Sequence, residues 1–498
     1  MSTVEPGHRA HDVNRRARLG IRLLMVRQVL VQLLMFGSGV VLARTLPPAD
    51  FGSFGIALFV VTLAGRLTEL GLQPALIQRA GELEERELRT AFTIQQGAAL
   101  LITALVWCGA GALPGLYPGT SPGLVWMVRL LSLELSLATW RGLSEVLLER
   151  ALRYDRLAPI DVTGSVAYAV VGIGASLHGQ GAWSFVWAFL ASSVLRTALV
   201  FQAAPWPIRP RLDRRAARRL LRAGIPVQIT LTVTHAQYWV TPTLVAGMVG
   251  PEAVGFLQWA SGNGRKPLEF LDNVARVSLP HFSILQSDVA EVERLLTRYV
   301  HVFVLVCGLW LAMLAVAGRD LVALVYTARW DPAVPALALF AAVGLLVAVR
   351  VIVGTALVGL GRMVYTARAS SVGALVTIGA SVALVMVLGP LGVPLGQLAG
   401  AAVTLPLMVH GLGDRSSARI LGPAARGLCP IAAAAGVGLG VQATTLSPPL
   451  RGLVTAGAMT LVYGAVAWWT GPAWMRTTTW RELALAPRAA APASSSPR

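Results

Sequence analysis

Long apolar stretches separated by short polar segments make up most of this chain. Apolar runs lie at 30–43, 98–112, 302–317 and 335–348. With their flanks they reach the roughly 20 residues that cross a bilayer as a helix. Placing such stretches in order along the chain predicts an all-α polytopic membrane protein with about 14 transmembrane helices.

One predicted helix, at 256–280, carries a polar stripe. At about 100° per residue its polar positions fall within roughly 40° of one line. They are Gln258, Gly262, Arg265, Glu269, Asp272 and Arg276, and the opposite side is apolar. Charges at membrane depth cost ~2.5–3.5 kcal/mol each unless they face a cavity or a partner. We therefore expect this helix to line a wet cavity; the alternative is a helix that lies in the membrane interface.

An internal repeat divides the chain into two halves. Gly20-Ile21 recurs as Gly224-Ile225, and the turn PADFG at 48–52 recurs as PEAVG at 251–255. We expect two six-helix lobes in pseudo-twofold repeat, with a substrate path between them and two further helices after them. The expected segments are a basic arm at 1–18, the first lobe at 19–204, a basic linker at 205–222, the second lobe at 223–411, the last two helices within 424–470, and a disordered tail at 475–498.

The composition agrees with a membrane protein, with 55% hydrophobic and 13% charged residues. The net charge of +18 is not a sign of nucleic-acid binding, because the basic residues follow the predicted loops. Of 42 Lys and Arg, 28 fall in segments assigned to the cytoplasm and four in segments assigned to the other side. This positive-inside bias places both termini in the cytoplasm and the chain in the cytoplasmic (inner) membrane. The charged segment 141–156 is expected to lie along the interface, and 318–334 is the largest expected outer segment.

Metal and redox chemistry have no support in the sequence. Cys108, Cys307 and Cys429 lie singly in apolar runs, and the seven His form no HExxH motif. We therefore expect no metal, no cofactor and no disulfide framework. The first 18 residues lack the apolar core of a secretory signal.

Charged residues inside the predicted spans are the candidate functional residues. Arg66, Glu69 and Gln73 are expected to share one helix face. Arginine outnumbers acid, and guanidinium groups suit phosphate oxygens, so an anionic cargo is expected. The candidate substrate-binding residues are Arg27, Arg66, Arg129, Arg265, Arg276 and Arg350, and those for ion coupling or charge balance are Glu69, Asp161, Glu269 and Asp272. Helix-pairing ion pairs or interfacial anchors are the alternative, which we favour for Asp161, Arg196 and Arg368.

Several stretches resemble the polysaccharide-exporter family, the Wzx-type flippases of the multidrug/oligosaccharidyl-lipid/polysaccharide exporter superfamily. They are VLARTLPPADFGSFGIALFVVTLAGRLTELGLQPALIQR in the first half, and GPEAVGFLQWA, ARWDPAVPALALFA and ALVGLGR in the second. The resemblance implies fourteen helices in two lobes around a cationic cavity, and transport by alternating access. It also implies an undecaprenyl-pyrophosphate-linked oligosaccharide as cargo, for O-antigen, capsule or exopolysaccharide synthesis, coupling to H⁺ or Na⁺, and cooperation with a glycan polymerase and chain-length machinery.

Three other functions are weighed against this one. A membrane glycan polymerase or glycosyltransferase needs a large outer loop with a catalytic acid or His, and the expected outer segment 318–334 contains only Asp320 and Asp331. We therefore expect no enzyme and no catalytic residue. A drug antiporter for cations needs an acidic cavity. A flippase for the lipid-linked peptidoglycan precursor shares the expected cationic cavity and is the nearer alternative.

Overall fold

The computed structural model describes residues 6–79, 81, 83–121, 123–206, 209–286, 288–413 and 427–472, and within these ranges the regular structure is entirely helical. The chain divides into two compact units, Met1–Gln258 and Trp259–Arg498. The all-α fold that the sequence predicts is therefore confirmed. The boundary between the units lies at Gln258, so residues 223–258, which we expected to open the second lobe, belong to the first unit.

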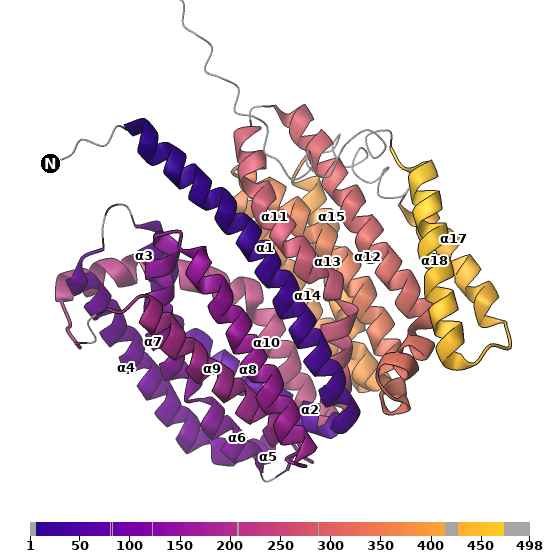
Figure 1. The fold of residues 1–498 in the computed structure, drawn as a ribbon, viewed down its shortest axis with the longest axis horizontal. Coiled ribbons are helices and arrows are strands. Elements are labelled where there is room, and N and C mark those ends of the chain that lie inside the picture. The colour runs from indigo at the N-terminus through magenta and orange to yellow at the C-terminus, as the bar shows by residue number, and fades with distance from the viewer. Residues whose placement is uncertain are drawn as a thin grey trace, which may run out of the picture. The chain divides into compact units, whose positions relative to one another are not determined.

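Long helices pack side by side in the first unit (Figure 1). There α1 lies along α8, α2 packs against α4 and α6, and α7 packs against α9. Leu42, Phe54, Leu124 and Phe185 are buried in its largest apolar cluster. Its helices are α1 (Pro6–Thr45), α2 (Pro48–Glu69), α3 (Leu72–Gln78), α4 (Glu85–Gly109), α5 (Leu113–Leu116), α6 (Gly123–Leu131), α7 (Glu134–Arg150), α8 (Tyr154–Leu177), α9 (Trp183–Ala203) and most of α10 (Arg214–Gly264).

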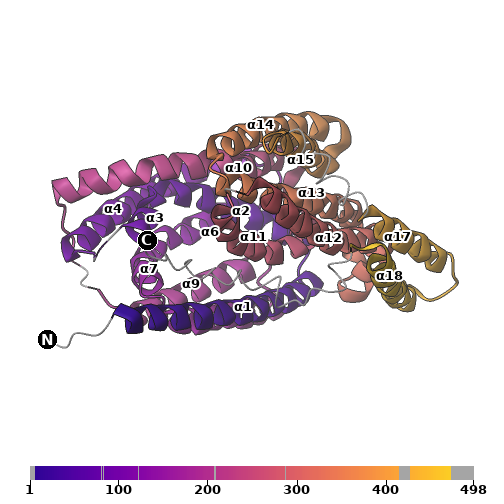
Figure 2. The ribbon, with the colours of Figure 1, turned by 90° about the horizontal axis from the view of Figure 1, so that it is seen from above.

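The second unit is also a helical bundle. Figure 2 shows α14 and α15 side by side, and α17 and α18 as a pair that packs on α12. Tyr463 of α18 fixes this pair by donating a hydrogen bond to the Leu305 carbonyl at 2.7 Å. Its helices are α11 (Lys266–Ile284), α12 (Val289–Val325), α13 (Val334–Gly359), α14 (Met363–Leu388), α15 (Gly392–His410), α17 (Leu428–Gln442) and α18 (Pro448–Thr470), with a 3₁₀-helix at Ala328–Ala333.

Ten stretches of the described chain are long and apolar enough to cross a membrane. One of them, Met363–His410, contains both α14 and α15, and α10, α11 and α17 lie outside the ten. Together these elements account for the fourteen spans that the sequence predicts. Gly250 divides α10 with a positive φ of 78°, a backbone conformation that glycine adopts without the strain of a Cβ.

Two expected boundaries are wrong. The helix that carries Arg141 begins at Glu134 and packs along α4 and α9, so residues up to Arg150 belong to the spanning stretch Gly123–Arg150 and not to a separate interfacial helix. The expected outer segment at 318–334 begins within α12, which continues as a helix to Val325.

Candidate functional site

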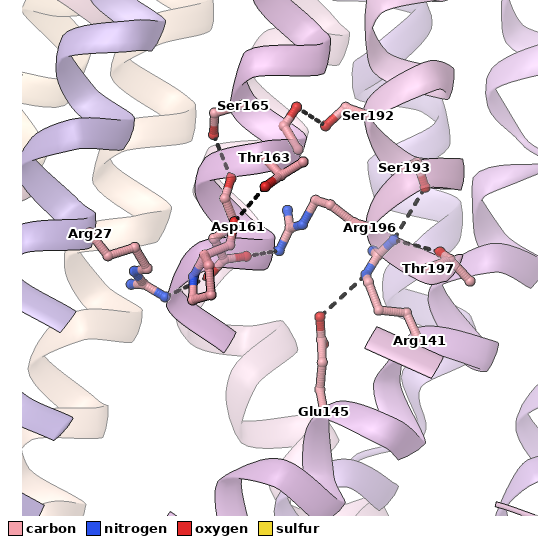
Figure 3. Close-up of polar contacts among 12 residues, drawn as sticks. Arg27, Arg141, Glu145, Asp161, Thr163, Ser165, Ser192, Ser193, Arg196 and Thr197 are labelled. Carbon is pink, nitrogen blue, oxygen red and sulfur yellow. Dashed lines mark hydrogen bonds and ion pairs between the residues drawn. The ribbon is translucent and has the colours of Figure 1, made fainter. Parts of the chain in front are cut away.

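Three charged side chains from three helices of the first unit meet inside the bundle (Figure 3). Arg27 of α1 donates to Asp161 Oδ2 of α8 at 2.7 Å, and Arg196 of α9 donates to Asp161 Oδ1 at 2.5 Å. Glycine permits this approach, because a Cβ on Gly164 would lie 2.4 Å from Cγ of Arg196. The helix-pairing interpretation of Asp161 and Arg196 is confirmed, and Arg27 joins the same group.

A second polar group lies beside the first, and sequence reasoning missed it. Arg141 of α7 donates to Glu134 Oε1 at 2.8 Å, to Ser193 Oγ at 3.2 Å and to Thr197 Oγ1 at 3.4 Å. Its Nε lies 3.4 Å from Glu145 Oε1, and Ser193 donates to the other oxygen of Glu134. The signal was present in the sequence, because intervals of seven and four residues place Glu134, Arg141 and Glu145 on one helix face.

These two groups form what we call the first-unit polar network: Arg27, Glu134, Arg141, Glu145, Asp161 and Arg196. Three arginines face three carboxylates, so the formal charges cancel when all six are ionised. Arg141 and Glu134 are only 15% and 14% exposed. The other four side chains are 21–36% exposed. A charge-balanced network offers an anion little net attraction, and its ion pairs connect α1, α7, α8 and α9.

Arg66 and Glu69 form the ion pair that the sequence predicts, at 3.0 Å. Their side chains are 43% and 41% exposed, which makes this pair more accessible than the polar network. Gln228 of α10 donates to the Arg66 carbonyl at 2.7 Å, and so anchors the last turn of α2. The expected third member, Gln73, does not share this face. Leu70 has a positive φ of 50° that ends α2, and Gln73 packs near Gly142 of α7 instead.

Arg129 of α6 lies among tryptophans. Its guanidinium group is 5.1 Å from the ring centre of Trp126 and 5.9 Å from that of Trp107, within the range of cation–π attraction. It donates to the Trp107 carbonyl at 3.2 and 3.3 Å. Both tryptophans are exposed. Arg129 therefore belongs to an aromatic surface of the first unit and lies outside the polar network.

The polar stripe expected on one continuous helix is interrupted in its middle. Arg265 stands between α10 and α11 with φ −97° and ψ 14°, and α11 begins at Lys266. Arg265 donates to Ser261 Oγ, and its guanidinium carbon lies 5.3 Å from the ring centre of Phe340. Lys266 Nζ lies 3.2 Å from Glu269 Oε1. This break places two cationic side chains at the positive N-terminal end of α11.

The two remaining stripe residues, Asp272 and Arg276, are in α11, but their side chains lie outside the described part of the structure. The apolar side of the helix at 256–280 is buried at some positions and exposed at another. Leu257, Trp259 and Leu271 are buried, and Val274 is 37% exposed.

Arg350 is the most isolated of the candidates. It lies in α13 about nine residues before the helix ends at Gly359, or ~14 Å along the axis. Its side chain is half-buried, and it makes no hydrogen bond or ion pair with any residue that the structure describes. A guanidinium group at this depth, without a carboxylate from the described residues, is suited to an anionic partner.

Asp320 is not placed for catalysis. It is 4% exposed, and Arg451 of α18 binds both of its carboxylate oxygens at 2.8 Å. Gln442 of α17 donates to it at 2.8 Å. The residue joins α12 to the C-terminal helix pair. Within the described ranges, no group of three His, Cys, Asp or Glu is placed to hold a metal ion.

Solved structures share this fold. A lipid II flippase, MurJ, in an inward closed conformation matches 93% of this chain and all of its own length, with a TM-score of 0.71 at 13% identity. An inward-facing multidrug resistance MATE family transporter of the MOP superfamily matches 82% of this chain and 98% of its own, with a TM-score of 0.57 at 15% identity. At these identities the likeness is one of fold.

Two curated relatives come from polysaccharide biosynthesis. The lipopolysaccharide biosynthesis protein WzxC of Escherichia coli (strain K12) is 22% identical over 326 residues, which cover 65% of this chain and 66% of WzxC. The succinoglycan biosynthesis transport protein ExoT of Rhizobium meliloti (strain 1021) is 25% identical over 176 residues, or 35% of each chain. The match thus spans less than two thirds of the length of each relative.

The sequence profile of one protein family covers most of the expected first lobe and part of the second. It is described as "Polysaccharide biosynthesis protein" and matches residues 41–335. This range is more than half of the chain, and it contains α2 to α9, the break at Arg265 and the start of α13. The chain is thus a multi-pass membrane protein that belongs to the polysaccharide biosynthesis protein family.

Proposed function

We propose that this protein moves an undecaprenyl-pyrophosphate-linked oligosaccharide repeat unit across the cytoplasmic (inner) membrane by alternating access. Membership of the polysaccharide biosynthesis family supports a role in making a surface glycan. ExoT, by its name a transport protein, and the fold likeness to a flippase favour transport over sugar transfer. The excess of arginine in the predicted cytoplasmic segments supports cytoplasmic termini.

The observation that carries this proposal is the contrast between two sets of charges. In the polar network of the first unit, every arginine faces a carboxylate. In the second unit, Arg350 faces no described carboxylate, and Arg265 stands at a helix break next to Lys266, which pairs with Glu269. Broken helices whose N-termini face anionic groups are a recurring feature of transporter binding sites. We assign the pyrophosphate to Arg265 and Arg350 of the second unit, and Arg66 and Arg276 remain candidates from the sequence.

Ion coupling is assigned to Glu69 and Glu269. Their carboxylates are 41% and 42% exposed, so water and ions can reach them. Asp161 is a weaker candidate, because two guanidinium groups already occupy its two oxygens. Asp272 remains a candidate from the sequence alone.

Reconstitution tests the proposal directly. The purified protein is placed in liposomes that carry a fluorescent undecaprenyl-pyrophosphate oligosaccharide in the inner leaflet, and movement is followed by an impermeant quencher. We expect quenching that depends on the protein and on an imposed ion gradient. Absence of movement for any lipid-linked oligosaccharide, or transfer of sugar to an acceptor, would contradict the proposal.

A peptidoglycan precursor is the second candidate cargo, since MurJ, the structure with TM-score 0.71, is a lipid II flippase. Both cargoes carry the same polyprenyl pyrophosphate, so the cationic residues do not separate them. The same liposome assay with lipid II as the cargo distinguishes the two candidates. Faster movement of lipid II than of a repeat-unit glycolipid would favour the second candidate.

A further inference from the structure

The backbone at 211–213, in the basic linker before α10, is held against α4 by hydrogen bonds. The Arg211 backbone N–H donates to Thr93 Oγ1 of α4 at 2.9 Å, and the Thr93 hydroxyl donates to the Arg211 carbonyl at 3.1 Å. The Asp213 N–H donates to Thr90 Oγ1 at 3.2 Å. Asp213 then accepts from the backbone N–H groups of Arg215 and Ala216, at 2.9 and 2.8 Å, and so caps α10. The helix that follows is therefore held against α4 from its first residue.

The first turns of α10 have two different faces. Ala216 and Leu220 are 1% and 5% exposed, and Leu220 packs in an apolar cluster with Leu72, Phe92 and Trp206. At about 100° per residue, the opposite side of the helix carries four arginines within a 100° arc. They are Arg214, Arg215, Arg218 and Arg222, all exposed. We call these four residues the arginine face.

The arginine face differs from Arg86, Arg89 and Arg219 because it has no acidic partner among the described residues. Arg219, outside the arc, forms an ion pair with Glu87 at 3.3 Å, and Glu84 and Glu85 pair with Arg86 and Arg89. In contrast, no side chain of the arginine face makes a hydrogen bond or ion pair with any described residue. Four like charges on one face repel one another unless anions from outside the chain neutralise them.

The residue after the arginine face indicates what those anions are. Ile225 falls within the same arc, one turn further along α10, and is 44% exposed. The exposed face thus changes from guanidinium groups to an aliphatic side chain as the helix enters its apolar part. A nucleic acid or an acidic protein presents anionic groups but no adjoining hydrocarbon layer for Ile225 to contact. A membrane surface has phosphates and then hydrocarbon in the same order.

We propose that the arginine face binds the phosphate groups of anionic phospholipids in the leaflet where α10 enters the membrane. The bound lipids neutralise the four guanidinium groups, and Ile225 contacts the upper acyl region. Because α4 and the Asp213 cap hold the helix, the face is presented in one orientation. Binding therefore needs little ordering of the chain.

The test compares two triple variants of the full-length protein that lose the same charge. One is Arg214→Gln, Arg215→Gln and Arg218→Gln; the matched control is Arg86→Gln, Arg89→Gln and Arg153→Gln, whose arginines have acidic partners. Each protein is reconstituted into nanodiscs of phosphatidylcholine with or without phosphatidylglycerol, and the loaded nanodiscs are purified. Retained phosphatidylglycerol is counted by native mass spectrometry, and thermal stability is measured in both discs.

We expect the wild type and the control to retain phosphatidylglycerol and to gain thermal stability from it. The test variant should lose about fivefold in retention for each arginine removed. A triple lysine variant at the same positions should restore retention, which separates loss of charge from misfolding. Equal retention by the test variant and the wild type would overturn the proposal, as would an equal loss in the control.

Two further experiments test for partners other than phospholipids. Soluble diphosphate that displaces phosphatidylglycerol at equal concentration would show a discrete phosphate site in place of a lipid surface. A short DNA duplex that binds the wild type in neutral discs, and fails to bind the test variant, would assign the face to nucleic acid. Either result would contradict a lipid-binding role.

Discussion

Gly52 and Gly255 pack so closely against opposing backbone that neither position has room for a side chain. A Cβ on Gly52 would lie 1.6 Å from the Pro251 carbonyl oxygen, and a Cβ on Gly255 would lie 1.9 Å from that of Pro48. The two turns that repeat in the sequence therefore meet in the structure, each with its glycine against the proline of the other. The repeat thus has a physical role, because only glycine allows this contact on both sides.

Replacement of Gly52 by alanine should destabilise the protein by about 1–3 kcal/mol, since a backbone carbonyl cannot yield to the added methyl group as a flexible side chain would. Gly262→Ala is the control, because no atom lies within 4 Å of a Cβ at that helical position. Thermal unfolding of the purified variants measures the difference. A melting temperature for Gly52→Ala equal to that of the control would show that the turns are not in contact.

The first-unit polar network makes a prediction about folding. Arg141→Ala leaves Glu134 buried without its cation, which costs roughly 3–5 kcal/mol when one partner of a buried pair is removed. We expect much less protein in the membrane, measured by immunoblot. Arg141→Ala combined with Glu134→Gln removes the stranded charge and should recover part of the level. Normal amounts of the single variant would mean that the network adds little to stability.

The Asp213 cap predicts a dependence on pH. Hydrogen bonds from the Ala216 and Arg215 N–H groups hold the pKa of this carboxyl below its ordinary value. A lowered folded-state pKa contributes stability that is present above the unfolded pKa, about 3.9, and is lost as the pH falls through the folded value. The melting temperature of wild type should therefore exceed that of Asp213→Asn near neutral pH, and the two should converge in acid. A constant difference across this range would contradict the argument.

The sequence predicts what is local and misses what depends on neighbouring helices. The apolar spans follow from length and hydropathy, and the Arg66–Glu69 pair follows from a spacing of three residues on one helix. Gln73 was misplaced because Leu70 and Gly71 both have a positive φ and end α2 before it; Gly71 was the available signal, since glycine commonly ends a helix in this conformation. Arg141 was placed in the interface because its partners Ser193 and Thr197 come from another helix. Pairings between distant segments leave no periodic signal.

The last prediction separates a cargo contact from a structural charge. Arg350 has no described ionic partner, so Arg350→Ala strands no described carboxylate and should leave the protein at normal levels. Loss of a charge-assisted contact to pyrophosphate should instead abolish glycan export. Arg350→Lys should be intermediate, because an ammonium group replaces the guanidinium fork only as a point charge. Arg141→Ala is the matched control. It removes the same charge, but from the first-unit polar network, so it should lower the amount of protein in the membrane. The measurement is complementation of an export-deficient strain alongside membrane protein levels. Normal export by Arg350→Ala would remove its cargo role, and disappearance of the protein would show that Arg350 is structural.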